Sequence, residues 1–294
     1  MMAAGLLLAR TKVVPKDVFL IANRIVYYVG LPALIFGNLI KNSGTTDADP
    51  AVIAVVLGGI AGMFLLMWLI LPLFVKDSKR RGAITQASLR SNDSIFTLTV
   101  AAAVLGEGNF GMTIFTAALS ATLFNVLSIL TLELNRGAKP RFGTFVRHVV
   151  LNPVILAVAA GYLFRFAGWT LPAVLQKPVD QFAAMVTPLG FLILGGILSW
   201  DSLQKNRRAL AWIVPCKLLL VPLLMTGIAL LLGFRGERLL TVLLIFAAPT
   251  AMASYPLAAA MDSDSVLAGE AVALTTACSL PTVFLFLTVF GGLL

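Results

Sequence analysis

Long apolar stretches alternate with short polar breaks along the whole chain. A helix of roughly 20 apolar residues crosses a hydrocarbon core of about 30 Å, and all the stretches but the first approach or exceed that length. No segment shows the alternating pattern of about 10 residues that a membrane barrel requires, so we predict an all-α polytopic membrane protein. The ten predicted transmembrane helices lie near residues 1–9, 17–40, 51–75, 86–105, 111–134, 145–167, 180–200, 209–233, 238–261 and 265–292.

The two sets of five spans resemble each other. Three short matches recur in order: Ala3-Ala4-Gly5 as Ala159-Ala160-Gly161 and Pro32 as Pro188 at an offset of 156 residues, then Ala101-Ala102-Ala103 as Ala258-Ala259-Ala260 at 157. Because five is an odd number, the second set must enter the membrane from the opposite side, as in inverted-repeat transporters. We therefore predict a first repeat at 1–134, a cytoplasmic linker at 135–144 and a second, inverted repeat at 145–294.

The same offset indicates that the first span is incomplete. The sixth span begins near Phe145, so the matching start of the first span falls about 11 residues before Met1. A helix of about 9 residues cannot cross a bilayer. The expectation is a truncated first span, with a native start upstream of Met1 as one explanation.

Composition and charge agree with a membrane protein. Of the 294 residues, 59% are hydrophobic and only 12% charged, which is too little polar surface for a soluble globule of this size. Fourteen Lys and Arg residues lie in the loops after predicted spans one, three, five and seven, against five after spans two, six and eight. The positive-inside rule places the first group in the cytoplasm and both termini outside, in an inner membrane. The net charge of +9 therefore does not indicate nucleic-acid binding.

The fourth span opens with the richest polar cluster at lipid depth. It reads Arg90-Ser91-Asn92-Asp93-Ser94, followed by Thr97 and Thr99. Polar groups in the membrane are costly and commonly mark a substrate pathway. The simpler interpretation is the cytoplasmic start of a helix, with Ser91 or Asn92 as its cap and the Arg90 side chain extending to the interface.

The ninth span carries the matching irregularity. Pro249 and Pro256 stand seven residues apart, with Ser254 and Tyr255 between them, and interior prolines break or kink a helix. Freed peptide groups at membrane depth must be buried in protein or line a wet cavity, and half-helix N-termini suit a carboxylate. We predict that broken helices four and nine cross near the midplane; a simple proline kink without a ligand is the alternative.

Lys217 in the eighth span is a further candidate. It could neutralise an anionic substrate, pair with Asp93, or extend to the cytoplasmic face, and the sequence does not choose among these. Asp264 is expected to cap the tenth span. The single histidine, His148, has no second histidine or cysteine partner, so we predict no metal site and no cofactor. Motifs of hydrolases, metalloproteases and phosphate-binding loops are absent from the sequence.

Taken in order, several of these segments resemble the auxin efflux carrier family, whose bacterial members include malate and malonate permeases. The matching segments are Leu31-Pro32-Ala33-Leu34-Ile35-Phe36, Arg90-x-Asn92, Asn152-Pro153 with Gly161, Lys217 with Pro222, and Pro249-Thr250-Ala251 with Tyr255 and Ala258. The resemblance implies five plus five inverted spans, with a substrate site at crossed, broken helices four and nine between a scaffold and a moving unit. It also implies that Asn92 lies at the site of a mono- or dicarboxylate. Where the family commonly has Gly-x-Pro, this chain has Thr97-Leu98-Thr99, which predicts a softer break.

The function predicted from these observations is secondary transport of a small organic anion by alternating access, not enzymatic catalysis. The alternative is a sodium-coupled organic anion symporter of the related bile-acid type, so the coupling ion is a proton, carried by Asp93, or sodium. An intramembrane enzyme and a non-transporting receptor are the other classes considered. The predicted partners are the organic anion, the lipid bilayer, the coupling ion and, in a homodimer, a second copy of the chain. The predicted substrate-binding residues are Arg90, Asn92, Asp93, Thr97, Thr99, Lys217, Pro249, Ser254, Tyr255 and Pro256.

Overall fold

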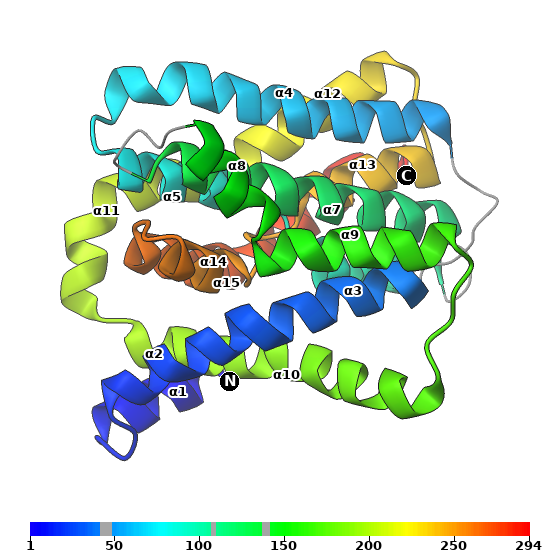
Figure 1. The fold of residues 1–294 in the computed structure, drawn as a ribbon. Helices are drawn as coiled ribbons and strands as arrows, with labels where there is room; N and C mark the ends of the chain where they lie inside the picture. The colour runs from blue at the N-terminus through cyan, green and yellow to red at the C-terminus, as the bar shows by residue number, and fades with distance from the viewer. Residues whose placement is uncertain (42–48, 107–109, 137–141) are drawn as a thin grey trace.

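The computed structural model describes residues 1–41, 49–106, 110–136 and 142–294, and this part of the chain is built from helices (Figure 1). The predicted linker lies largely outside the described residues, since it includes 137–141. The helices, with three short π-helical segments labelled η, are α1 (Met2–Arg10), α2 (Lys16–Ile25), η1 (Val26–Gly30), α3 (Leu31–Lys41), α4 (Pro50–Phe74), α5 (Ser78–Leu89), η2 (Asp93–Thr97), α6 (Leu98–Leu105), α7 (Gly111–Leu134), α8 (Phe142–Val150), α9 (Pro153–Phe166), α10 (Ala173–Ile197), α11 (Trp200–Pro215), η3 (Cys216–Leu220), α12 (Val221–Leu231), α13 (Glu237–Ala247), α14 (Ser254–Ala260) and α15 (Ser265–Phe290).

Several helices are long and apolar enough to cross a membrane. Within the described ranges there are six such helices, and a seventh if the pair α8 and α9, which is bent by 60°, forms one span. The six are Asp17–Lys41, Pro50–Phe74, Gly111–Leu134, Ala173–Ile197, Trp200–Leu231 and Ser265–Phe290. The remaining three predicted spans differ from these because α1 has nine residues and the fourth and ninth spans are interrupted. The chain is a multi-pass helical membrane protein.

Three predicted helix starts are wrong by about two turns. Helix α5 begins at Ser78 rather than near 86, α10 at Ala173 rather than near 180, and α11 at Trp200 rather than near 209. Two of these starts have side-chain caps, since Asp77 accepts a hydrogen bond from the Arg80 N–H and Ser199 accepts one from the Ser202 N–H. Lysine and arginine are good helix formers, so the helices continue through basic residues that hydropathy assigns to loops. The predicted cap Asp264 is confirmed, because its side chain accepts from the Leu267 N–H at 3.0 Å.

The helices pack as two groups. Helices α1, α2, α3, α9 and α10 contact one another extensively, and α4 to α7 do so with α11 to α15. Contacts between the groups are sparser, and α1, α2 and α10 of the first group lie lowest in Figure 1. We call them the α1–α10 group and the α4–α15 group. The arrangement leaves a boundary that runs through the middle of the molecule.

The α1–α10 group depends on a close approach of two helix backbones. A β-carbon added at Gly5 of α1 would lie 1.9 Å from the carbonyl oxygen of Leu192 in α10, and one added at Gly195 of α10 would lie 2.0 Å from that of Met2. These obstacles are backbone atoms, which cannot rotate away as a side-chain tip can. Glycine is therefore required at both positions for α1 to dock.

Replacing Gly195 with alanine should lower the thermal stability of the purified protein. Overpacking of this kind typically costs about 1–3 kcal/mol, because the two helices must move apart. The matched control is Gly62→Ala in α4, where an added β-carbon meets no atom within 4 Å and alanine favours the helix. Equal melting temperatures for the two variants would show that the α1–α10 contact does not stabilise the fold.

Candidate functional site

Two interrupted helices meet in the interior of the molecule. The chain leaves the helical path after Leu89 and again after Ala247, and the two extended segments run antiparallel with Ser91 opposite Thr250. The N–H of Asn92 donates to the carbonyl of Pro249 at 2.9 Å, and the N–H of Ala251 donates to the carbonyl of Arg90 at 3.3 Å. Each break thus supplies partners for peptide groups freed by the other, which a buried backbone requires. We call residues 90–92 and 249–251 the crossing.

The sequence explains the second break better than the first. Pro249 has no N–H to donate within a helix and disfavours helical backbone at Ala248, which is extended with ψ at 142°. The first break contains no proline, and its extended residue Arg90 has ψ at 123°. It follows the last turn of α5 directly, whereas the sequence placed a softer break at Thr97–Thr99. We attribute its position to pairing with the second break.

Side chains from neighbouring helices hold the crossing in place. The Thr250 hydroxyl donates to the carbonyl of Ala87 at 2.6 Å, and the Thr250 N–H donates to Oγ1 of Thr275 in α15 at 3.2 Å. Gln86 Nε2 donates to the carbonyl of Ser254 at 3.2 Å. These bonds tie α5, the crossing and α15 together, so the crossing is a fixed part of the α4–α15 group.

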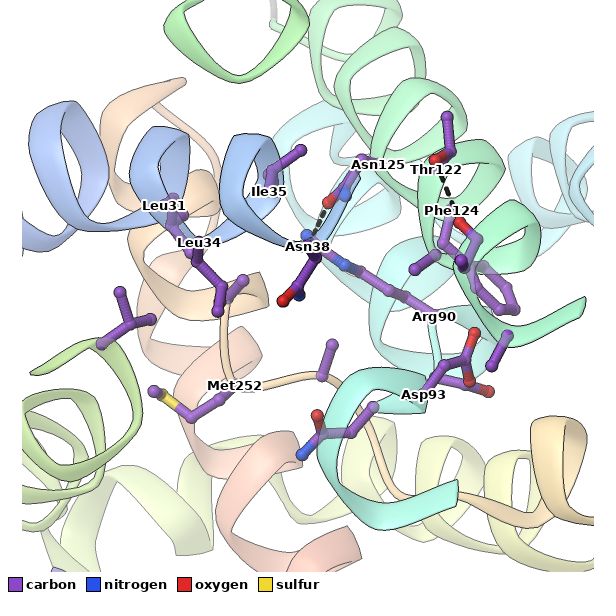
Figure 2. Close-up of a pocket in the computed structure, with 18 of the residues that line it drawn as sticks. Leu31, Leu34, Ile35, Asn38, Arg90, Asp93, Thr122, Phe124, Asn125 and Met252 are labelled. Carbon is purple, nitrogen blue, oxygen red and sulfur yellow. Dashed lines mark hydrogen bonds between the residues drawn. The ribbon is translucent and has the colours of Figure 1, made fainter. Parts of the chain in front are cut away.

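A cavity of about 210 Å³ lies beside the crossing, between the two helix groups (Figure 2). It is far larger than the 10–15 Å³ that one water molecule needs. The α1–α10 group contributes residues of α3 and α10, and the α4–α15 group contributes η2, α6, α7 and the crossing. Its lining includes Leu31, Leu34, Ile35, Asn38, Lys41, Arg90, Ser91, Asn92, Asp93, Ala117, Thr122, Phe124, Asn125, Val186, Thr187, Ala251 and Met252.

Arg90 is the main charged group of this cavity. Its side chain extends away from Asp93 toward Asn125 and Asn38 (Figure 2), and Nη2 donates to the Asn125 carbonyl oxygen. Nη1 has no hydrogen-bond partner, and no carboxylate of the described residues lies within 4.0 Å of the guanidinium. Because Arg90 is only 5% exposed, this positive charge is buried without a carboxylate in direct contact, and Asp93 of the same lining interacts with it only from beyond 4.0 Å.

Asp93 lies on the other side of the Arg90 backbone. Its Oδ2 accepts a hydrogen bond from the hydroxyl of Ser120 in α7 at 2.5 Å, and its Oδ1 has no partner among the described residues. The lining therefore combines the unpaired atoms of Arg90 and Asp93 with the amides of Asn38 and Asn92, the Lys41 ammonium and several hydroxyl groups, among apolar side chains. Such a set recognises a small molecule that carries both an anionic group and an apolar or protonated part.

Of the ten predicted site residues, Arg90, Asn92 and Asp93 line this cavity and the other seven do not. Thr97 donates to the carbonyl of Leu244, and Pro249 accepts from Asn92. The remaining predicted residues are placed as follows: Ser254, Tyr255 and Pro256 are buried in α14, Thr99 is exposed on α6, and Lys217 is buried in η3.

The simpler interpretation is wrong for the two basic residues. Arg90 and Lys217 do not extend to a membrane interface, since Arg90 is 5% and Lys217 0% exposed. Asn92 does stand at a helix start, because η2 begins at Asp93 and the Asn92 carbonyl accepts a hydrogen bond from the Phe96 N–H at 3.1 Å. The Lys217 ammonium instead donates to the Ser91 hydroxyl at 2.6 Å and to the Phe246 carbonyl at 3.0 Å.

The sequence interpretation missed Asn38 in α3 and Asn125 in α7. Each is an amide within a long apolar span, where a polar side chain needs a reason to be present. That signal was available in the sequence, but neither residue stands next to a proline or a second polar group. Only the fold shows that both side chains approach Arg90.

Comparison with known proteins agrees with this architecture. Residues 1–287 match the family described as "Membrane transport protein". The chain is 26% identical over 269 residues to a protein of Methanothermobacter thermautotrophicus named "Uncharacterized transporter", with 88% of this chain and 84% of that protein aligned. It is 29% identical over 139 residues to a Rhizobium meliloti protein named "Putative malonate transporter", with 47% and 43% aligned. The chain therefore belongs to the membrane transport protein family, the auxin efflux carrier family.

Proposed function

We propose that the protein is a secondary transporter that carries a small organic anion, a mono- or dicarboxylate, across the inner membrane by alternating access. The observation that supports this proposal most directly is the buried Arg90 guanidinium, which lines a cavity at the crossing and has no carboxylate of the described residues within 4.0 Å. A buried cation is stable only when it is paired, and a carboxylate suits the planar fork of a guanidinium. The name of the Rhizobium meliloti relative, which mentions malonate, agrees with this substrate class.

The position of the cavity supports alternating access. Asn38 and Val186 belong to the α1–α10 group, whereas Arg90, Asn92 and Asp93 belong to the α4–α15 group. A site at the boundary of two packed units can be exposed to either side when one unit moves against the other. We infer that the α1–α10 group is the scaffold and that the α4–α15 group moves with the substrate.

Contacts that recur at the sequence offset support two inverted repeats of five spans. Gly5 packs against Leu192 of α10, and Gly161, 156 residues later, packs against Leu39 of α3. Asp93 after the first break bonds Ser120 of α7, and Thr250 at the second break bonds Thr275 of α15. The same pairs of helices therefore meet in the two halves, with contact partners two or three residues from the offset. With the positive-inside bias, this plan places both termini outside.

Uptake into proteoliposomes tests the proposal directly. Purified protein should give saturable uptake of a labelled mono- or dicarboxylate, above that of empty liposomes. Binding of an anion without any flux would instead indicate a receptor, and turnover of a labelled lipid without transport would indicate an intramembrane enzyme. The coupling ion follows from uptake against imposed pH gradients, for which Asp93 is the proposed proton carrier.

Replacing Asn92 with alanine should lower uptake about 10-fold or more without loss of stability. The backbone N–H that bonds Pro249 is retained in alanine, so the crossing should persist, while the cavity loses one amide. A hydrogen bond to a charged group contributes about 1.5–3 kcal/mol. The control is Gln176→Ala, which removes an amide outside this cavity, and unchanged uptake by Asn92→Ala would exclude a role of its side chain in binding.

A further inference from the structure

The second break leaves backbone carbonyls at the end of α13 without helical partners. The Phe246 carbonyl would accept from the N–H of Thr250 in a continuous helix, but that N–H donates to Thr275 instead. The next carbonyl toward the N-terminus, that of Ile245, faces Pro249, which has no N–H. Carbonyls at a helix C-terminus carry partial negative charge. In secondary transporters with broken helices, such carbonyls hold the coupling cation.

In this chain a lysine fills that place. Lys217 Nζ donates to the Phe246 carbonyl at 3.0 Å and to the Ser91 hydroxyl at 2.6 Å, so one ammonium joins the end of α13 to the first break. The side chain is 0% exposed, and no carboxylate of the described residues lies within 4.0 Å of Nζ. Neutral hydroxyl and carbonyl oxygens are the ligands that a hard monovalent cation takes in proteins.

The local backbone directs Lys217 to this position. Residues Cys216–Leu220 form the π-helical segment η3, which interrupts the regular turn between α11 and α12, with Pro215 before it and Pro222 after it. Segments of this kind occur frequently at functional sites. The lysine does not line the cavity, so its charge acts through the crossing rather than through contact with the anion.

We propose that the Lys217 ammonium permanently occupies the place of a coupling sodium ion, so that the carrier works without sodium. This inference rests on the proposed transport function but concerns the cation at the crossing, not the anion. It rejects the sodium-coupled alternative for this chain. It also predicts a gain of function, because removal of the ammonium should open a site for a small cation between Ser91 and Phe246.

Melting curves of the purified protein in sodium chloride and in choline chloride at equal ionic strength test this inference. Wild type should melt at the same temperature in both salts. Lys217→Ala should melt at a lower temperature than wild type in choline chloride. Sodium chloride should raise the melting temperature of this variant by roughly 2 °C or more, since a ligand that binds only the folded state stabilises it. The matched control is Lys217→Met, which removes the charge but fills the space and should show no sodium response.

Two results would overturn the inference. One is a sodium-specific stabilisation of the wild-type protein, and the other is a folded Lys217→Ala variant that responds to neither sodium, lithium nor potassium. If Lys217→Ala cannot be purified in choline, recovery in sodium chloride supports the inference, and equal loss in both salts counts against it. These curves need neither substrate nor flux. A failure of anion uptake would therefore reject the transport function while leaving the cation site tested.

Discussion

Replacing Arg90 with methionine should abolish anion uptake while leaving the protein as stable as wild type, or more so. The guanidinium is buried with a hydrogen bond to Asn125 and no carboxylate of the described residues within 4.0 Å, so its burial is costly in the absence of substrate. Methionine keeps much of the apolar volume and removes the unpaired charge. The bound anion, by contrast, loses the lining cation at the crossing, since Lys217 faces Ser91 and Phe246 and the other lining cation, Lys41, pairs with Asp180. Truncating one partner of a buried charge pair costs about 2–5 kcal/mol, which is roughly 30-fold or more in the dissociation constant.

The measurement is uptake of the best substrate into proteoliposomes, together with the melting temperature of the same preparation. Arg24→Met is the control, because this change removes the same chemical group from an exposed residue of α2 that does not line the cavity. A variant that loses both uptake and stability would assign Arg90 to the fold. A variant that transports normally would remove it from the site.

The sequence predicted the broken segments because their causes are local. Pro249 removes a donor, and a run of polar residues beginning at Arg90 cannot remain at lipid depth without partners. The pairing of the two breaks is a long-range contact between Asn92 and Pro249. A hydropathy profile does not represent contacts between residues that are distant in the sequence. The family resemblance accordingly placed the first break too late, at Thr97–Thr99, and the hydropathy pattern left residues 78–85 of α5 outside the fourth span.

The cavity could be predicted only in part for the same reason. Arg90, Asn92 and Asp93 are consecutive in the chain or nearly so, and one polar cluster marks all three. Asn38 and Asn125 come from two other helices, and each is a single amide in an apolar span. Packing between the two helix groups decides which face of α3 and of α7 turns inward. This orientation cannot be predicted from a single sequence.

A disulfide between α10 and the crossing should stop transport completely and reversibly. Gly190 belongs to the α1–α10 group and Met252 follows the crossing; a β-carbon added at Gly190 would lie 1.9 Å from Met252 Cε and 3.8 Å from its Cγ. Cysteines at both positions would share the space of the Met252 side chain within bonding reach. The native Cys216 and Cys278 are replaced first. Uptake should fall to the level of empty liposomes on oxidation and return on reduction, because the bond joins the scaffold to the group that moves.

The matched control is a cysteine pair within one group. A β-carbon added at Gly161 of α9 would lie 2.8 Å from the Leu39 β-carbon of α3, so cysteines at these positions require only a small separation to bond. Because both helices belong to the α1–α10 group, oxidation of this pair should leave uptake at the level of its own reduced form, which is the reference because Leu39 lines the cavity. Full uptake by a completely cross-linked Gly190–Met252 pair would mean that the crossing does not move relative to α10. The carrier would then need a different mechanism of access, with Arg90 exposed alternately by local rearrangement of side chains rather than by movement of one helix group against the other.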